Sequence, residues 1–317
     1  MSAPVLRVDG LRVGFDHPLG WVQAVDDVSF ALMPGERFGL AGESGSGKST
    51  LALAILRMIK PPGRIQGGEV WLAGTRLADL DEDGVRALRL AGIALVPQAS
   101  MNSLNPVLRV GQQIIDAFAD HGQRLGRSEA ERRVTGLLGE VGLPEAVARM
   151  YPHELSGGMK QRACIAIAIS LRPKVIIADE PTSALDVVVQ RQVMATLARV
   201  QRELGAAVIL VGHDMGLMAQ FVDRLGVMYA GRLVEVARIA EIITRPRHPY
   251  TRALIAALPS LDTRGTLSGI PGLAPLLRDL PPGCAFHPRC PHAVDRCRSE
   301  KPAVREVEGA QVACHLA

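Results

Sequence analysis

The chain has 317 residues, 48% of them hydrophobic and 3% aromatic, which is enough for one large α/β domain and a smaller part. The formal net charge is +4, from 36 basic and 32 acidic residues, and no block of lysine and arginine resembles a nucleic-acid-binding arm. The longest apolar runs, such as 163–171 and 206–212, are too short to cross a bilayer, and the N-terminus lacks a signal-peptide pattern. We therefore expect a folded, soluble, cytoplasmic protein that does not bind nucleic acid.

In residues 1–97 the sequence pattern predicts several strands, with one loop and one helix between them in the chain. Apolar or alternating segments bounded by turn residues predict strands at 5–15, 22–32, 38–41, 69–73 and 93–97. The run 38–41 is continuous and apolar, as in a buried strand, and the segment 51–56 that follows predicts a helix. The Pro-Pro-Gly sequence at 61–63 ends that helix.

A change of pattern between about residue 99 and residue 158 predicts a helical insertion. Helical periodicity, with Gly and Pro between the segments, covers 110–118, 127–141 and 144–150. Helices and strands then alternate again, with helices at 159–171 and 187–204 and strands at 175–178 and 207–211. Beyond residue 259, Pro, Gly and Cys become frequent and periodicity fades, so we expect one domain of residues 1–258 and a small extension of residues 259–317.

The segment from Gly42 to Thr50 has the pattern of a phosphate-binding loop, G-x-x-x-x-G-K-[ST], between a predicted strand and a predicted helix. Glycines allow backbone N–H groups to surround a triphosphate, and the helix start adds a favourable dipole. Lys48 can reach the β- and γ-phosphates, and the Ser49 hydroxyl can bind Mg²⁺. The alternative, a glycine-rich turn with a chance lysine, is disfavoured by the flanking strand and helix. The residues expected to bind nucleotide here are Gly42, Ser44, Gly45, Ser46, Gly47, Lys48, Ser49 and Thr50.

Asp179 and Glu180 follow a buried apolar strand, which can carry a carboxylate to a nucleotide site. An aspartate in that place can hold Mg²⁺, directly or through water. The glutamate after it can polarise the attacking water as a general base, an effect of roughly 10²–10⁴-fold. A surface turn is the alternative for an isolated Asp-Glu pair, but a phosphate-binding loop in the same chain favours the catalytic interpretation.

The octapeptide from Leu155 to Arg162, Leu-Ser-Gly-Gly-Met-Lys-Gln-Arg, precedes and enters a predicted helix. Ser156, Gly157 and Gly158 form a second potential anion-binding helix start. One chain does not need two γ-phosphate sites for one ATP, whereas two chains arranged head to tail do. We therefore expect this segment to bind the nucleotide of a partner chain. An ordinary helix cap is the alternative for Ser-Gly-Gly alone.

These motifs together resemble the nucleotide-binding subunit of an ABC transporter, over nearly the whole chain. The phosphate-binding loop, Gln98, the octapeptide, Asp179-Glu180, Ser183-Ala184-Leu185-Asp186 and His213 stand in the family's order. The resemblance implies an α/β fold: a P-loop ABC-type ATPase core with an N-terminal antiparallel β subdomain, a helical insertion and a small cysteine-rich C-terminal extension. It also implies that the cofactors are ATP and Mg²⁺, with Ser49, Gln98 and Asp179 as the Mg²⁺ ligands.

The same resemblance implies roles for three further residues. Gln98 senses Mg²⁺ and the attacking water and links them to the permease contact. His213 contacts the γ-phosphate, and Asp186 belongs to a loop that crosses the dimer interface. Without the resemblance, a surface amide for Gln98 and a hydrogen-bonded histidine at a strand end for His213 are the better interpretations.

An adenine base needs an aromatic platform, and Phe15 at the end of the first predicted strand is the candidate. Trp21 is the second candidate. Ordinary packing is the alternative for both. Tyrosine is frequent at this position in the family, so phenylalanine is a departure that keeps the stacking face.

Three segments refine the resemblance: Ser-Leu-Asn-Pro at 103–106, His-Pro-Tyr-Thr-Arg-Ala-Leu at 248–254, and the proline- and cysteine-containing segment 280–290. All three are similar to the dipeptide/oligopeptide importer group. The implied function is that of an ATPase subunit which powers uptake of di- or oligopeptides. Nickel or another solute is the alternative within the same group, because the ATPase does not define the solute.

The resemblance implies three kinds of partner: two transmembrane permeases, a second and homologous ATPase subunit, and an extracytoplasmic solute-binding protein. It places the chain at the cytoplasmic face of the cell membrane as a peripheral subunit. A soluble ABC ATPase acting on ribosomes or DNA is a rival, but two such domains or a long coiled-coil insertion are not evident. A P-loop kinase leaves the octapeptide unexplained.

Four of the five cysteines lie in the last stretch of the chain, with the spacing C-x5-C-x6-C-x16-C. The close C-x2–4-C pairs typical of zinc knuckles are absent, and loosely spaced thiolates suit an iron–sulfur cluster better. The importer-group resemblance also implies a [4Fe–4S] cluster. Zinc, with His287, His292 or His315 helping, and free thiols remain alternatives. The predicted cluster ligands are Cys284, Cys290, Cys297 and Cys314, whereas Cys164 is predicted to lie in the core.

Overall fold

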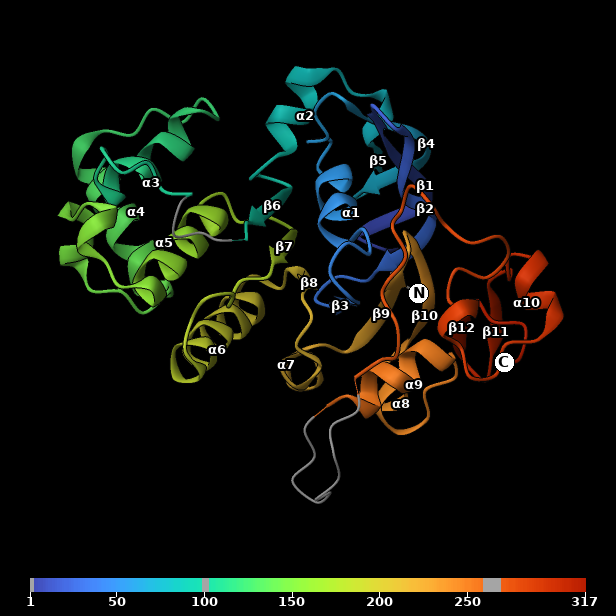
Figure 1. Ribbon diagram of the computed structural model, residues 1–317. Coiled ribbons are helices and arrows are strands. Elements are labelled where there is room, and N and C mark those ends of the chain that lie inside the picture. Colours follow the sequence, from blue (N-terminus) through green and yellow to red (C-terminus); the bar gives the residue numbers. More distant parts are fainter. Residues whose placement is uncertain (1–2, 99–102, 259–268) are drawn as a thin grey trace. The chain divides into compact units, whose positions relative to one another are not determined.

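The computed structural model describes residues 3–98, 103–258 and 269–317 (Figure 1). The chain forms two compact units, which we describe separately. Unit 1 consists of Met1–Leu6, Leu32–Glu36 and Leu72–Ile209, and unit 2 of Arg7–Ala31, Arg37–Trp71 and Leu210–Ala317. The predicted start of the helical insertion at residue 99 and the predicted domain boundary at residue 259 lie outside the described residues.

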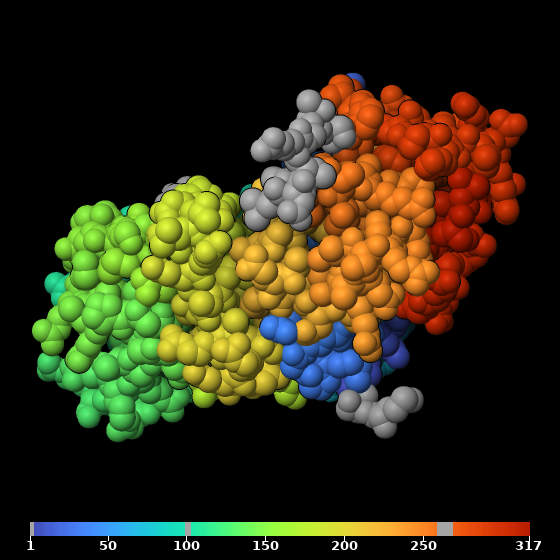
Figure 2. Space-filling view, turned by 90° about the horizontal axis from the view of Figure 1, so that it is seen from below, coloured from blue at the N-terminus to red at the C-terminus, as the bar shows by residue number. Residues whose placement is uncertain are grey.

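Unit 2 contains a mixed sheet with the strand order β11-β12-β10-β9-β3. β3 (Arg37–Ala41) pairs in parallel with β9 (Arg224–Tyr229), and β10 (Arg232–Arg238) pairs antiparallel with β9. The last two strands come from the C-terminal segment, and their bounds are β11 (Arg305–Val307) and β12 (Ala310–Val312). β12 pairs with β10, so the cysteine-containing segment extends the sheet instead of forming a core of its own. Figure 2 shows the red atoms of the C-terminal segment beside the orange atoms of the residues that precede it in unit 2.

A second sheet of unit 2 has the order β2-β1-β4. The bounds are β1 (Leu6–His17), β2 (Gly20–Leu32) and β4 (Gly63–Leu72). Only two residues join the neighbouring strands β1 and β2, so these strands run antiparallel. The predicted strands 5–15 and 22–32 and the antiparallel β subdomain are thus confirmed.

Unit 1 is built on parallel strands in the order β8-β7-β6. β6 (Ile93–Val96) and β7 (Val175–Asp179) pair in register from Ile93 opposite Val175 to Val96 opposite Ala178. β8 (Ala207–Val211) runs from unit 1 into unit 2. Every residue of β7 and β8 is buried, as expected for parallel strands covered on both faces.

The helices of unit 1 include the predicted insertion. Their bounds are α2 (Glu82–Leu88), α3 (Val110–Ala119), α4 (Arg127–Glu140), α5 (Gly157–Ile169) and α6 (Val187–Leu204). The helix predicted at 144–150 is wrong, because Glu145–Arg149 forms a short 3-10 helix. Pro144 and Met150, which flank this segment, are both extended, so the segment has the short length at which 3-10 turns commonly serve as connectors.

The remaining elements of residues 3–98, 103–258 and 269–317 are short. They are α1 (Lys48–Ile55), β5 (Thr75–Arg76), α7 (Met215–Phe221), α8 (Ile239–Thr244), α9 (Pro249–Ala256), α10 (Asp295–Ser299) and the 3-10 helices Leu77–Asp79, Pro152–Glu154 and His287–Arg289. Within the described ranges, no helix has the length and apolar character needed to span a membrane.

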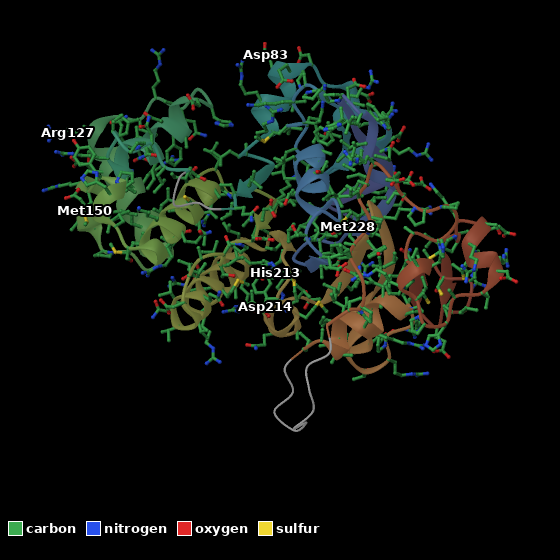
Figure 3. The ribbon with its side chains drawn as sticks, viewed as in Figure 1. Asp83, Arg127, Met150, His213, Asp214 and Met228 are labelled. Carbon is green, nitrogen blue, oxygen red and sulfur yellow. The ribbon has the colours of Figure 1, made fainter. Side chains whose placement is uncertain are left out.

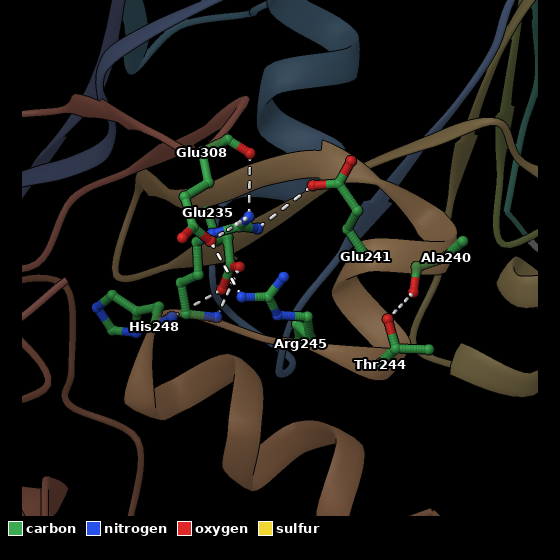
Figure 4. A network of polar contacts seen from close by, with 8 residues as sticks. Glu235, Ala240, Glu241, Thr244, Arg245, His248 and Glu308 are labelled. Atoms are coloured by element: carbon green, nitrogen blue, oxygen red, sulfur yellow. Dashed lines mark hydrogen bonds and ion pairs between the residues drawn. The ribbon is translucent and has the colours of Figure 1, made fainter.

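A buried carboxylate fixes the segment between α8 and α9. Glu235 on β10 is 0% exposed, and it accepts hydrogen bonds from the backbone N–H groups of Arg247 and His248, both at 2.9 Å (Figure 4). The Arg247 guanidinium also contacts the carboxylates of Glu241 on α8 and Glu308 in the β11–β12 turn. This network joins the C-terminal segment to the rest of unit 2 and sets the start of α9.

Candidate ATP-binding and hydrolysis site

The predicted phosphate-binding loop lies between β3, which ends at Ala41, and α1, which begins at Lys48. Gly42 and Gly47 have φ values of 151° and 100°. A Cβ on Gly42 would come within 2.2 Å of the Met228 carbonyl oxygen, and one on Gly47 within 2.2 Å of the Ala24 carbonyl oxygen. Only glycine fits these two places, because the backbone conformation is left-handed and the space is closed. The strand–loop–helix geometry expected from the motif is present.

Lys48 is held beneath the loop, with 6% of its surface exposed. Its Nζ donates hydrogen bonds to the carbonyl oxygens of Gly42 and Glu43, both at 2.9 Å, and lies 3.4 Å from the Ser46 Oγ. The ammonium group is thus fixed in place by the loop. A fixed positive charge at a glycine-rich helix start is suited to a triphosphate.

The loop also has two contacts that the motif did not predict. The Glu43 N–H donates to the Tyr250 hydroxyl at 2.9 Å, and the Glu43 carboxylate pairs with Arg289. Tyr250 is oriented from α9, where its own N–H donates to His248 Nδ1 at 3.0 Å. Burial, and secondarily Arg252, lowers the pKa of His248 to about 4, so the ring is neutral and can accept this bond.

In unit 1 the structure brings Gln98 and Glu180 together. Gln98 Nε2 donates to Glu180 Oε2 at 2.8 Å. Asp179 is the last residue of β7 and is 7% exposed, whereas Glu180 is less buried and has a φ of 43°. Positive φ is uncommon for a residue other than glycine, and at Glu180 the backbone departs from the extended conformation of β7. The Gln98 amide therefore orients the Glu180 carboxylate, which directly follows the end of β7.

Ser156 is the N-cap of α5, and its Oγ accepts a hydrogen bond from the Met159 N–H at 3.4 Å. The Ser156 side chain is exposed, and Gly157 begins the helix. A Cβ on Gly158 would come within 2.5 Å of Val189 Cγ1, so this glycine allows α5 to approach α6 closely. The ordinary capping interpretation is therefore present in the geometry, and binding of a partner's nucleotide stays a prediction.

Asp186 and His213 are both exposed and both precede helices. The Asp186 carboxylate caps α6 by accepting from the N–H groups of Val188 and Val189, both at 3.0 Å. His213 follows β8, and the next residue, Asp214, caps α7 (Figure 3). Asp186, with its predicted interface role, is thus itself a helix cap, and His213, with its predicted γ-phosphate contact, directly precedes one.

The two candidate adenine platforms lie in the β1–β2 region of unit 2. The Phe15 ring is half-buried against Gly63, where a Cβ would come within 2.5 Å of its Cε1. Trp21 covers Gly14, donates from Nε1 to Gln23 Oε1 at 2.9 Å, and has the Arg64 guanidinium 4.7 Å from its ring centre. Both rings therefore have packing contacts, and the stacking role of Phe15 stays a prediction.

The four C-terminal cysteines lie near one another in unit 2. Burial raises the pKa of the Cys284 thiol, and the neighbouring Cys297, Cys314 and Cys290 raise it further. None of the five cysteines is in a disulfide. Among the residues that the structure describes, however, no group of three or more His, Cys, Asp or Glu has an arrangement that could hold a metal ion. The geometry therefore does not support the predicted cluster, although the thiols are gathered.

Cys164 lies in α5, where burial raises the pKa of its thiol to about 12. It is 6% exposed, which confirms the prediction that it belongs to the core. A thiol of this kind stays protonated at neutral pH and is a weak nucleophile.

The chain matches two protein families. Residues 25–183 match the family described as ABC transporter, and residues 234–297 match the oligopeptide/dipeptide transporter C-terminal region. The first match spans the phosphate-binding loop, Gln98, Ser156 and Glu180. The second spans the segment from β10 to Cys297. This segment contains Tyr250, whose hydroxyl contacts the phosphate-binding loop.

Similar proteins and structures agree with these matches. The chain is 44% identical to the oligopeptide transport ATP-binding protein OppD of Escherichia coli (strain K12), over 98% of this chain and 92% of that protein. It is 43% identical to the dipeptide transport ATP-binding protein DppD of the same organism, over 98% and 96%.

A dimeric, post-hydrolysis ATP-binding cassette bound to ADP and Pi has a TM-score of 0.66 and 28% identity, covering 74% of this chain and 98% of that one. The cbiO1 cassette of Clostridium perfringens, part of an ABC transporter complex, has a TM-score of 0.64 and 27% identity, covering 77% and 92%. Together with the phosphate-binding loop and the two family matches, these similarities show that the chain belongs to the ATP-hydrolysing, ATP-binding subunits of ABC transporters, in the oligopeptide/dipeptide group.

Proposed function

We propose that this ATPase powers the uptake of di- or oligopeptides across a cell membrane. The observation that carries the proposal is the similarity to oligopeptide and dipeptide transport proteins over 98% of the chain, including the C-terminal region. A cassette alone does not recognise the solute, so nickel or another solute handled by the same group is the second candidate. The proposed location is peripheral, on the cytoplasmic face of the membrane.

The proposed partners are two transmembrane permeases, a second and homologous ATPase subunit and an extracytoplasmic solute-binding protein. ATP closes two ATPase subunits on two nucleotides, and hydrolysis reopens them. A permease segment near Gln98 follows this motion, so each nucleotide state favours one permease state. We also propose that residues 1–258 form the nucleotide-binding domain, with the helical subdomain at about 99–158, and that residues 259–317 are its extension.

The residues of the loop are proposed to bind the phosphates of ATP, with Lys48 as the central positive charge. Phe15 is proposed to stack on adenine, and the oxygen ligands proposed for Mg²⁺ are those of Ser49, Gln98 and Asp179. Glu180 is proposed as the general base, which the Gln98 amide orients at 2.8 Å. His213 is proposed to contact the γ-phosphate, Ser156, Gly157 and Gly158 to bind the partner chain's nucleotide, and Asp186 to contribute to the dimer interface.

Reconstitution of this ATPase with its two proposed transmembrane permeases tests the transport proposal. The chain should co-purify with these permeases from detergent-solubilised membranes, and ATP-dependent uptake of a labelled tripeptide into vesicles should require the solute-binding protein. Uptake of Ni²⁺ without peptide uptake would replace the proposed solute by a metal ion. Sedimentation with ribosomes and no permease association would reject a transport role and support the soluble ABC ATPase.

We further propose that Cys284, Cys290, Cys297 and Cys314 hold a [4Fe–4S] cluster, with a zinc ion as the alternative. Two observations support the proposal. The number of thiols equals the number of ligands that such a cluster takes. The thiols also lie near enough to raise the pKa of Cys284 and Cys290, although burial is the larger cause at both.

Metal analysis of anaerobically purified protein tests the cluster. We expect about four iron atoms per chain and visible absorption, with both lost in Cys290→Ser. Cys164→Ser is the matched control, because Cys164 lies in α5 and should leave the iron content unchanged. Stoichiometric zinc without iron would replace the cluster by a zinc site, and protein without metal would reject both.

A further inference from the structure

We propose that Arg289, in the C-terminal segment, is a positioning residue that neutralises the Glu43 carboxylate in the phosphate-binding loop and so keeps the loop attractive to a triphosphate. Both residues belong to unit 2. The inference rests on the proposed function of the loop as the phosphate site. It gives the C-terminal segment a role in nucleotide affinity that is separate from its cysteines.

The pair has the geometry of a strong, specific ion pair. Arg289 Nη1 lies 2.7 Å from Glu43 Oε2, and Arg289 Nη2 lies 2.9 Å from Glu43 Oε1. These are two parallel charge-assisted hydrogen bonds, an arrangement that only arginine can make with a carboxylate. The Arg289 side chain is 6% exposed and that of Glu43 is 28% exposed, so water screens the pair only in part.

Other contacts fix the guanidinium in place. Arg289 Nε donates to the Pro271 carbonyl oxygen at 2.8 Å, and Nη1 donates to the Tyr229 hydroxyl at 3.3 Å. The guanidinium carbon lies 5.9 Å from the Tyr229 ring centre and 6.0 Å from that of Phe286. An arginine guanidinium is charged at every physiological pH. The positive charge is therefore permanent and held at one point.

Glu43 is equally fixed on the loop side. Its carbonyl oxygen accepts from Lys48 Nζ at 2.9 Å and from the Ser46 N–H at 3.2 Å, and its own N–H is bonded to the Tyr250 hydroxyl. A cavity lined by residues 43–46 of the loop is also lined by residues 274–277, which come from the same segment as Arg289. The C-terminal segment thus borders the loop directly.

A carboxylate next to an anion site works against the binding of a triphosphate, because like charges repel at short range. Lys48 alone would then face both the phosphates and Glu43. With Arg289 in place, the Glu43 charge is cancelled, and the carboxylate serves only to anchor the loop. The alternative is a purely mechanical tether, in which the charges have no effect on the nucleotide. The two possibilities predict opposite results for a double substitution.

The experiment measures equilibrium binding of ATP to the full-length chain, with and without substitutions at both positions. Arg289→Met should weaken ATP binding about tenfold, because it leaves the Glu43 charge unpaired. Glu43→Gln should tighten binding about two- to threefold, because Arg289 then adds positive charge near the phosphates. The double substitution Arg289→Met/Glu43→Gln should recover to within about threefold of the wild type. Arg296→Met is the matched control, since Arg296 pairs with Glu300 on the exposed side of the same segment.

Two results would overturn the inference: wild-type affinity in Arg289→Met, or a double variant as weak as Arg289→Met alone, which is the behaviour of a mechanical tether. If Arg289→Met does not fold by circular dichroism, Glu43→Gln decides alone, and weaker binding in that variant rejects the proposal. Lys48→Ala in the same assay tests the loop itself. Unchanged ATP affinity in Lys48→Ala would reject the phosphate site, independently of Arg289.

Discussion

Replacing Glu180 by glutamine should lower ATP turnover at least about 100-fold while ATP binding survives. The structure gives the physical reason. Glu180 follows the buried end of β7, and its carboxylate accepts a hydrogen bond from Gln98 Nε2 at 2.8 Å. A glutamine keeps the size of the side chain and can still accept this bond through its amide oxygen, but it cannot take a proton from water. The substitution therefore removes the base and leaves the shape.

The measurement is steady-state ATP hydrolysis by the assembled transporter, with ATP binding measured on the same preparation. Glu180→Gln should accumulate an ATP-bound dimer, which size-exclusion chromatography with ATP can detect. Glu203→Gln is the matched control, because Glu203 is an exposed carboxylate on α6. Turnover close to the wild type in Glu180→Gln would show that another group is the base. Loss of ATP binding would show that the residue acts on the ground state instead.

The parts of the site that the sequence predicts are those built from local segments. A buried strand, a glycine-rich turn and a helix start are neighbours in the chain, so the loop from Gly42 to Thr50 could be placed by pattern alone. The same holds for Asp179 and Glu180, which follow a fully apolar strand. In both cases residues within about ten positions of one another determine the order of strand, turn and helix. The sequence pattern therefore predicts these local elements without knowledge of the tertiary contacts.

The parts that sequence reasoning missed depend on contacts between distant segments. Tyr250 reaches Glu43 across 207 positions and Arg289 reaches it across 246, and neither contact has a local signal. One indication was present: a glutamate inside a loop that must attract phosphate is unexpected and suggests a compensating cation. The family resemblance covered the His-Pro-Tyr and Pro-Arg-Cys segments, but it did not indicate that they contact the loop.

The second large effect is expected from substitutions at Lys48 and Ser156. In the proposed site, Lys48 binds the nucleotide of its own chain and Ser156 binds the nucleotide of the partner chain. Lys48→Ala should weaken ATP binding to its own chain at least about 100-fold, because two or more hydrogen bonds from a charged donor are lost. The substitution also removes the bonds from Nζ to the Gly42 and Glu43 carbonyl oxygens, which hold the loop closed. Ser156→Arg should leave ATP binding to its own chain intact and abolish hydrolysis of the nucleotide bound by its partner.

The test uses a complex of two distinguishable ATPase subunits, in which Lys48→Ala or Ser156→Arg is introduced into one subunit at a time. Labelled ATP bound to each subunit is counted by cross-linking, and turnover is measured for the whole complex. Ser156→Asn serves as the control, because asparagine caps a helix about as well as serine and adds no charge. It should retain much more activity than Ser156→Arg, whose bulk and charge occupy the space at the start of α5. If Ser156→Arg removed ATP from its own chain as fully as Lys48→Ala does, the serine would belong to its own nucleotide and the head-to-tail dimer would be wrong.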